Sequence, residues 1–366
     1  MIPDYSAEEN YSVTSSEGRA SRAINSAPPP RITLPMKTRQ PRTGLPLSRL
    51  GFGAAQLGNL YRETSDEDAM AAVDRAYERG IRYFDTAPHY GLGLSERRLG
   101  AALARRPRDE FMLSTKVGRL LRPNPRSGDA LDDEGFAVPA RLVRQRDYSR
   151  DGVLRSIEES LERLGLGRID IAYVHDPDDF FDEALTAAIP ALVELREQGV
   201  VRAIGVGMNQ AAMLAEFVRR ADVDVVMVAG RYTLLDRSAE DDLLPAAQER
   251  GVGVVVAGVF NSGLLARDRP APGAKYDYQS APAALVEAAH EIAEICERHG
   301  VTLPEASLAF PLRHPAVMSV VLGMRTPSQV DDSLARMSAV VPDALWRGLA
   351  ARELLRAGSV LEGRQS

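Results

Sequence analysis

The chain has 366 residues, of which 45% are hydrophobic, and 45 basic against 51 acidic residues give a formal net charge of −6. The chain can therefore bury a large core, and an acidic balance without a basic stripe predicts no binding to nucleic acid or to an anionic membrane surface. The single cysteine, Cys296, excludes an internal disulfide and a cysteine-based metal site, which fits a cytoplasmic protein.

Residues 1–44 differ in composition from the rest of the chain, because they are rich in Ser, Pro, Arg and Glu. Such a segment buries too little apolar surface to offset the entropy lost when it orders. We therefore predict a disordered tail over residues 1–44 and one folded domain over residues 45–366. We expect neither a membrane span nor a secretion signal, since no run reaches about 18 apolar residues and no basic segment precedes an apolar one.

From about residue 46, strand-like runs alternate with helix-like runs. Short apolar runs with β-branched and aromatic residues predict strands, and apolar residues three and four positions apart predict helices. The predicted strands cover residues 49–56, 81–91 with its turn-forming end, 111–118, 169–176, 201–207, 223–229, 252–259 and 317–322. The predicted helices cover residues 65–80, 95–105, 148–164, 182–198, 210–220, 238–250, 283–299, 327–337 and 343–357.

This alternation predicts an α/β fold with parallel strands joined by right-handed crossovers. Eight strand–helix units favour a closed (β/α)8 barrel, the TIM barrel, over an open sheet. The segment from Arg119 to about Asp147 interrupts the alternation and shows little periodicity. We interpret it as a long loop, which is uncommon inside a compact domain unless it is functional or mobile.

Polar side chains stand at the carboxyl ends of three neighbouring predicted strands. Asp85 and Tyr90 follow the second strand, Lys116 lies near the end of the third, and His175 lies near the end of the fourth. These ends share one mouth in a barrel, so the four groups are expected to meet in one pocket. A Lys ammonium favours the phenolate of a neighbouring Tyr, and an Asp paired with that Lys keeps it charged. The Tyr could then exchange a proton with a carbonyl or alcohol oxygen, while a neutral His orients that oxygen.

Each of the four residues also has an ordinary explanation. An Asp after a strand commonly forms a turn, a Lys at a strand end is commonly a solvated charge, and a His within an apolar strand is commonly a core residue. The Tyr could be an aromatic lid. The joint placement of all four at the same ends of three strands favours a reaction site over packing.

The sequence around the second strand resembles a known family signature. The run RYFDTAPHYG at residues 82–91, followed by Ser95–Glu96, is similar to the signature of the aldo-keto reductase superfamily, and the resemblance covers residues 46 to about 340. It implies a (β/α)8 barrel, a nicotinamide cofactor and a catalytic tetrad. That tetrad would consist of the same four side chains, with Tyr90 as the general acid and base, Lys116 and Asp85 tuning it, and His175 holding the substrate.

Three later runs resemble one branch of the superfamily. They are GVGMNQ at residues 205–210, RYTLL at residues 231–235 and GVFNSG at residues 258–263, and they are most similar to the sugar-oxidising aldose dehydrogenase branch. This branch implies oxidation of an aldose such as L-fucose, D-arabinose or L-galactose at C1 to the lactone. Oxidation of pyridoxal, or general reduction of aldehydes and ketones, stays open as an alternative.

The resemblance also implies the cofactor contacts. Tyr232 would stack on the nicotinamide and Asn209 would bond its carboxamide, although the Gln that relatives use for a second carboxamide contact is not visible at residues 226–230. The turn at Asn261, Ser262 and Gly263 would approach the pyrophosphate. The implied cofactor set is completed by Gly53, Gly323, Arg325 and Gln329.

The last predicted strand bears on the choice of nucleotide. NADP-preferring relatives surround the 2′-phosphate with Lys, Ser and Arg, whereas the matching positions here are Gly323, Met324 and Gln329. A phosphate would therefore lack charge-assisted partners other than Arg325. We predict NAD as the cofactor, with NADP possible.

Two other classes of function stay open beside the oxidoreductase. A non-catalytic, nucleotide-binding subunit of the same fold would be indicated by loss of a tetrad residue, and none is lost. A Schiff-base enzyme would need Lys116 with a depressed pKa, whereas Asp85 should keep it charged. No metal is expected, because the five His are scattered. The expected partners are a small sugar or aldehyde and, as a monomer or small homo-oligomer, other copies of the chain.

Overall fold

The computed structural model describes residues 44–126, 128–277 and 279–355. The tail predicted over residues 1–44 lies outside the described residues, except for Gly44, and so does the end of the predicted domain at residues 356–366. Among the helices of the described part, none is long and apolar enough to cross a membrane.

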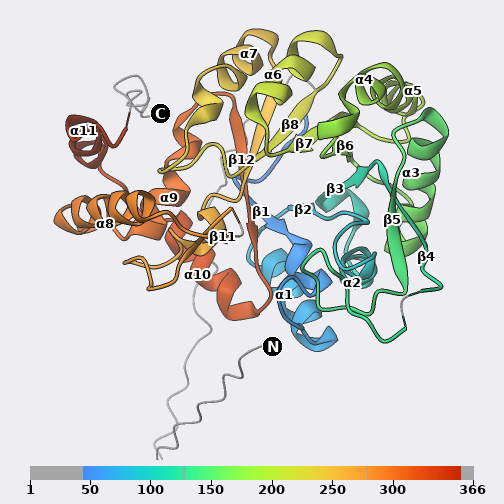
Figure 1. Cartoon of the computed structure of the whole chain (residues 1–366), viewed down its shortest axis with the longest axis horizontal. Coiled ribbons are helices and arrows are strands. Elements are labelled where there is room, and N and C mark those ends of the chain that lie inside the picture. Colours follow the sequence, from blue (N-terminus) through green and yellow to red (C-terminus); the bar gives the residue numbers. More distant parts are fainter. Residues whose placement is uncertain (1–43, 127, 278, 356–366) are drawn as a thin grey trace, which may run out of the picture. The chain divides into compact units, whose positions relative to one another are not determined.

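Eight parallel strands close into a barrel, as predicted, with helices packed around it (Figure 1). Each strand is buried on both faces, which explains why the sequence shows continuous apolar runs instead of alternation. The barrel closes because the first strand pairs with both the second and the last. In chain order the strands are β1 (Leu50–Gly53), β2 (Tyr83–Asp85), β3 (Met112–Val117), β6 (Ile171–His175), β7 (Ala203–Met208), β8 (Val225–Ala229), β9 (Gly253–Ala257) and β12 (Val317–Gly323).

Several helices of the outer layer start at a side chain that caps them. Ser65, Ser149 and Thr326 each accept a hydrogen bond from a backbone N–H in the first turn of α1, α3 and α10. The longer helices are α1 (Asp66–Glu78), α2 (Leu94–Leu103), α3 (Arg150–Leu164), α5 (Ile189–Glu197), α6 (Ala211–Arg220), α7 (Leu243–Arg250), α8 (Ala283–Arg298), α9 (Leu303–Ala309), α10 (Pro327–Met337) and α11 (Asp343–Ala351).

Three differences from the predicted elements concern whole elements around the barrel. The helix predicted over residues 182–198 consists of α4 (Phe181–Glu183), a π-helical segment at Ala184–Ala188 and α5, which follow one another directly. Helix α9 was not predicted, although a capping box at Thr302 and Glu305 marks its start. The region predicted as a loop after Arg119 contains an antiparallel pair, β4 (Arg119–Pro123) and β5 (Leu142–Arg146), beside α3 (Figure 1).

Three apolar clusters result from this arrangement in the described residues. One lies between the barrel and the helices, one fills the barrel itself, and a small one joins Leu92 to Leu121, Phe136 and Val138 of the β4–β5 region. Tyr83 and Tyr173 are fully buried inside the barrel, and their hydroxyl oxygens are 3.2 Å apart. The barrel is therefore a packed core, with its open space confined to the loops at the mouth.

Candidate active site

The loop that carries Tyr90 is fixed against the turn that follows β1. A Cβ on Gly91, which has φ of 60°, would lie 2.2 Å from the carbonyl oxygen of Gly58, so the two backbones approach in a way that only glycine permits. The hydroxyl of Ser95 donates to the carbonyl of Ala54 at 2.7 Å and bonds the hydroxyl of Thr86 at 2.8 Å. These contacts define the position of Tyr90.

Glu96 secures the same loop from the other side. Its side chain is fully buried and accepts hydrogen bonds from Thr115 Oγ1 at 2.7 Å and from Arg163 Nε at 2.5 Å. A buried carboxylate is tolerated only when it is paired and bonded in this way. The Ser–Glu part of the signature is thus structural and holds the neighbouring Tyr in place.

Asp85 and Lys116 form a buried ion pair at the ends of β2 and β3. Lys116 Nζ donates to Asp85 Oδ2 at 2.7 Å and to the carbonyl of Thr86 at 2.9 Å, and both charged side chains are at most 3% exposed. Burial alone would lower the pKa of Lys116, but Asp85 and Tyr90 outweigh it and raise that pKa above its usual value. Lys116 is therefore an ammonium, as the sequence analysis expected, and is unsuited to Schiff-base formation.

Tyr90 lies directly against this ammonium. The Lys116 Nζ atom is 4.6 Å from the centroid of the Tyr90 ring. Burial raises the pKa of Tyr90 above its usual value, while the Lys116 charge acts in the opposite direction. Burial thus disfavours the phenolate of Tyr90, and the buried Lys116 cation partly offsets this effect.

A chain of buried hydroxyl groups leads to the second oxygen of Asp85. Ser114 Oγ lies 2.7 Å from Asp85 Oδ1 and 3.1 Å from the hydroxyl of Tyr83, which lies 3.2 Å from that of Tyr173. A hydroxyl has one proton to donate. When Ser114 donates to the carboxylate, it accepts from Tyr83, so the chain is oriented toward Asp85. The sequence analysis did not identify this support.

His175 completes the group from β6. Its ring centroid is 5.9 Å from that of Tyr90, and its backbone carbonyl accepts a hydrogen bond from the hydroxyl of Tyr148 at 2.7 Å. Burial, assisted by the charge of Arg119, lowers the pKa of His175 well below its usual value, so the imidazole is neutral. The structure thus brings the four predicted residues Asp85, Tyr90, Lys116 and His175 together.

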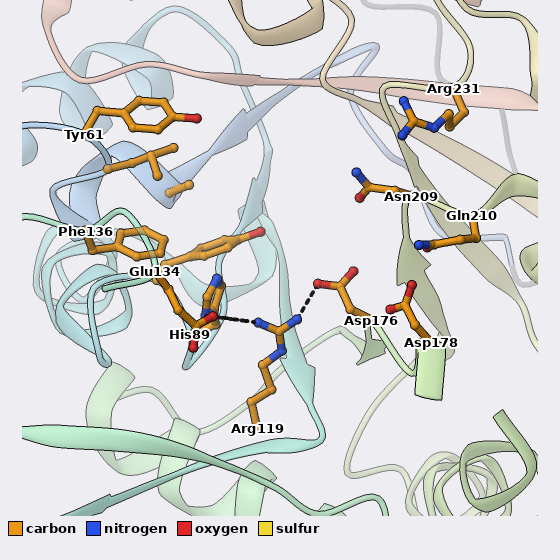
Figure 2. A pocket seen from close by; sticks show the side chains of 13 residues that line it. Tyr61, His89, Arg119, Glu134, Phe136, Asp176, Asp178, Asn209, Gln210 and Arg231 are labelled. Carbon is orange, nitrogen blue, oxygen red and sulfur yellow. Dashed lines mark hydrogen bonds and ion pairs between the residues drawn. The ribbon is translucent and has the colours of Figure 1, made fainter. Parts of the chain in front are cut away.

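Tyr90 lines a pocket of about 480 Å³. Figure 2 shows the side chains that form the wall of this pocket. Its wall is rich in charged and amide side chains, several of which come from the β4–β5 region and from the loops after β6 and β7. The lining residues are Ala55, Leu60, Tyr61, His89, Tyr90, Arg119, Glu134, Phe136, Asp176, Asp178, Asn209, Gln210 and Arg231. The sequence analysis named only Tyr90 and Asn209 among them as site residues. It interpreted the segment from Arg119 to about Asp147, which supplies Arg119, Glu134 and Phe136, as a functional or mobile loop without assigning single residues.

The loops after β8 and β9 form a glycine-lined cradle beside this pocket. Gly258 has φ of 66°, and a Cβ on it would lie 3.0 Å from the backbone nitrogen of Gly230. The Asn261 amide donates to the carbonyl of Gly230 at 3.3 Å, and its buried Oδ1 has no partner among the described residues. A cradle without Cβ atoms and with an unpaired buried carbonyl fits a polar, planar ligand such as a nicotinamide amide.

The predicted pyrophosphate turn has an unusual backbone. Asn261, Ser262 and Gly263 have φ of 43°, 56° and 98°, and the last two are exposed. Three successive residues in the left-handed region form a sharp turn at the carboxyl end of β9, and no heavy atom lies within 4 Å of a Cβ built on Gly263. The turn therefore leaves open space for a group that approaches its backbone.

The predicted stacking role of Tyr232 is not supported, and we correct it. The side chain is 2% exposed and packs in the core against Phe310 and His314, with ring centroids 5.0 and 6.2 Å away. The neighbouring Arg231 lines the pocket instead. The side chains of these two successive residues point in opposite directions. The Tyr232 ring is buried in the core because it is largely apolar, and a buried ring cannot contact a ligand.

Arg325 and Gln329, which were predicted to contact the cofactor after β12, are both bonded to other groups of the protein. Arg325 is buried and donates to the carbonyl of Leu60 at 3.0 Å and to Thr64 Oγ1 at 3.2 Å, so the guanidinium that we assigned to the cofactor anchors the loop after β1 instead. Gln329 Oε1 accepts from the backbone N–H of Arg325 at 2.9 Å, which engages this side chain at the start of α10.

Gly53 and Gly323 are paired neighbours on β1 and β12 at the mouth of the barrel. A Cβ on Gly323 would lie 2.0 Å from Gln56 Nε2, so a larger residue there would displace the Gln56 side chain. A Cβ on Gly53 would lie 3.0 Å from Val321 Cγ1, so close packing requires glycine at both positions. Their contact with a cofactor stays a prediction.

Comparisons with known proteins agree with this architecture. The sequence model of the Aldo/keto reductase family matches residues 49–351. The chain is 50% identical to D-threo-aldose 1-dehydrogenase of Pseudomonas sp. over 85% of this chain and 96% of that protein. It is 40% identical to pyridoxal 4-dehydrogenase of Microbacterium luteolum over 86% of this chain and 96% of that protein. The holo form of an aldo-keto reductase from Bacillus halodurans, 29% identical, superposes with a TM-score of 0.67 over 90% of this chain and all of that chain.

Proposed function

Since this chain belongs to the aldo/keto reductase family and is an oxidoreductase that acts on CH–OH groups, we propose that it oxidises an aldose at C1 to the lactone. The observation that carries the proposal is the pocket lined by Tyr90, whose wall holds five charged side chains, a neutral His and two amides. Such a wall offers donors and acceptors to a hydroxylated molecule, whereas it would leave buried polar groups unpaired against an apolar aldehyde. The 50% identical relative named for aldose oxidation supports the same choice.

In the proposed reaction, Tyr90 accepts the proton of the C1 hydroxyl. Lys116 favours the phenolate that this step needs, and Asp85 keeps Lys116 charged and oriented. The neutral His175 donates a hydrogen bond to the same oxygen and so holds C1 at a fixed place. When the hydride leaves C1 as the hydroxyl proton moves to Tyr90, the C1–O bond becomes the carbonyl of the lactone.

The residues present fit a nicotinamide cofactor, which supplies the hydride acceptor when it is bound. Asn209 would hold its carboxamide, and the turn at Asn261, Ser262 and Gly263 would approach its pyrophosphate. We propose NAD over NADP, because Arg325 is engaged with the loop after β1 and the pKa of its guanidinium is lowered by burial and by repulsion from Arg62. A 2′-phosphate would thus meet a cation that is already bonded elsewhere.

The proposal is tested by initial rates of reduced-cofactor formation with NAD or NADP against L-fucose, D-arabinose, L-galactose and pyridoxal. We expect NAD-dependent oxidation of at least one sugar, with kcat/KM about tenfold or more above that with NADP, since one charge-assisted bond is worth about 1.5–3 kcal/mol. Oxidation of pyridoxal alone would support the second candidate, which the 40% identical relative suggests. Tight nucleotide binding without turnover of any substrate would contradict the proposal.

The pH dependence of the reaction follows from the site. Oxidation needs Tyr90 as the phenolate, and because burial raises its pKa, the reactive fraction grows as pH rises toward that pKa. The pKa of His175 lies well below its usual value, so this residue stays neutral and adds no acidic limb. We expect kcat/KM for oxidation to increase steadily from about pH 6 to about pH 10, as one group titrates. A clearly steeper fall below about pH 6.5 would show that a second group, a His, also titrates and would contradict the neutral state of His175.

A further inference from the structure

The pocket contains a charged pair that the proposed reaction does not use. We propose that Arg119 and Asp176 form a subsite that binds two neighbouring hydroxyl groups of the substrate and thereby selects sugars over deoxygenated analogues. This inference rests on the proposed function and specifies which part of the sugar the site recognises.

The two side chains meet at the wall of the pocket (Figure 2). Arg119 begins β4 and Asp176 directly follows β6, and the Arg119 guanidinium donates to Asp176 Oδ2 at 2.6 Å. The Arg119 side chain is 8% exposed and that of Asp176 is 29% exposed. The pair is therefore shielded on the Arg119 side and accessible on the carboxylate side.

The backbone of Asp176 is held in a strained conformation that fixes its carboxylate. Its φ of 41° lies in the left-handed region, which costs free energy in a residue other than glycine. The backbone N–H donates to the carbonyl of Gly207 at 3.0 Å, and the carbonyl accepts from Arg146 at 3.1 Å. The hydroxyl of Tyr148 lies 2.9 Å from the same carbonyl and shares its one proton with the carbonyl of His175. These long-range contacts maintain a backbone geometry that the local sequence disfavours, and this geometry keeps the carboxylate at the pocket wall.

The carboxylate has unused capacity to accept hydrogen bonds. The bond from Arg119 goes to Oδ2, and among the described residues no donor is bonded to Oδ1. An ionised carboxylate can accept about four hydrogen bonds. Two adjacent hydroxyl groups could therefore donate to this carboxylate, while the guanidinium can donate to a hydroxyl oxygen in return.

His89 adds a neutral donor to the same wall. Arg119 Nη1 lies 3.2 Å from His89 Nδ1, and because a guanidinium only donates, that ring nitrogen must be the acceptor. The proton of the neutral ring is then on Nε2. Burial and the nearby charges of Arg119 and Arg144 lower the pKa of His89 to about 2, so the ring carries no charge.

The charged side chains of the wall are largely paired. Arg119 lies 2.6 Å from Asp176 Oδ2, and Arg231 lies 2.8 Å from Asp277 Oδ2. Paired charges supply donors and acceptors without a strong net charge of one sign. The subsite therefore fits the hydroxyl groups of an unmodified sugar.

The subsite lies next to the group that is proposed to hold the reacting oxygen. Asp176 Oδ2 is 3.5 Å from His175 Nε2, and the ring of His89 packs against that of His175 with centroids 5.5 Å apart. In a sugar whose C1 oxygen bonds His175, the C2 hydroxyl is on the adjacent carbon and the C3 hydroxyl on the next one, and we assign these two groups to Asp176.

The test couples removal of the carboxylate charge with removal of a hydroxyl. We would measure kcat/KM for the sugar that the wild-type protein oxidises best, and for its 2-deoxy and 3-deoxy forms, in the wild type and in Asp176→Asn. We expect the wild type to prefer the parent sugar over at least one deoxy form by about 10- to 100-fold, and the preference to shrink to about threefold or less in Asp176→Asn. Asp179→Asn, an equal change of charge at an exposed residue of the same loop, should retain the wild-type preference.

Because Asp176→Asn leaves the Arg119 guanidinium with only Glu134, 3.6 Å away, as a carboxylate partner, the double variant Arg119→Gln/Asp176→Asn is measured beside it, with thermal unfolding of each protein. A wild type that oxidises sugars, together with a folded Asp176→Asn that keeps the full preference, would overturn the subsite alone. A wild type that oxidises no sugar would overturn the proposed function and the subsite with it. A loss of stability without a change in preference would show that the pair is structural and would also refute the subsite.

Discussion

Replacing Tyr90 by Phe is expected to lower kcat for sugar oxidation by about 10²- to 10⁴-fold, because it removes the group proposed to accept the proton. The substitution keeps the ring and its packing against Phe136 and His175, whose centroids lie 6.1 and 5.9 Å away, so the fold and KM should change little. The measurement is the initial rate of oxidation with saturating cofactor and sugar.

A matched control is Tyr77→Phe, which removes a hydroxyl bonded to Glu110 in the outer helical layer. That variant should retain kcat within about twofold, because its hydroxyl lies on α1 and is not part of the proposed site. The lost hydrogen bond should lower the free energy of unfolding by only about 0.5–1.5 kcal/mol, so the protein should stay folded. A Tyr90→Phe protein that is folded, binds the cofactor and retains wild-type kcat would exclude Tyr90 as the base.

The second large effect concerns the buried ion pair. Lys116→Met should lower the free energy of unfolding by about 3–5 kcal/mol, because it leaves the Asp85 carboxylate buried without its cation. It should also lower kcat by about 10²-fold or more, because the phenolate of Tyr90 loses the charge that favours it. Chemical unfolding and initial rates measure the two effects on the same protein.

The double variant Asp85→Asn/Lys116→Met separates stability from activity. Without a buried charge, we expect it to recover most of the lost free energy of unfolding, since Ser114 can still donate to the amide oxygen at residue 85. Its kcat should stay as low as that of the single variant. Recovery of activity together with stability would mean that the pair acts only as a structural element and does not tune Tyr90.

The barrel and the four proposed reaction groups could be predicted because their signals are local. An apolar run of five to eight residues forms a buried strand almost wherever it is placed, and the alternation of such runs with helices leaves few topologies. In a parallel barrel, position at the end of a strand already assigns a residue to the mouth. Asp85, Lys116 and His175 were therefore placed correctly relative to one another without any knowledge of their contacts.

Loop residues were assigned less well, for a physical reason. Tyr232 was expected to stack on the cofactor and is buried against Phe310, and Arg325 was expected beside the cofactor and is bonded to the loop after β1. Both outcomes depend on residues about 80 to 260 positions away in the chain, where an unpaired donor or an apolar ring finds a partner only after the barrel has closed. A local pattern does not encode that choice.

The sequence by itself thus determined the α/β barrel, its family and the order of the groups around its mouth, because strand and helix periodicity and strand-end position are properties of short segments. The tertiary structure alone decided which loop side chains join Tyr90 and Asn209 in the wall of the pocket. Arg119 and Asp176 are 57 positions apart and meet only because β3 pairs with β6 and the β4–β5 region folds beside the mouth. The hydroxyl chain from Tyr173 to Asp85 likewise exists only because three strands turn their side chains into one closed interior.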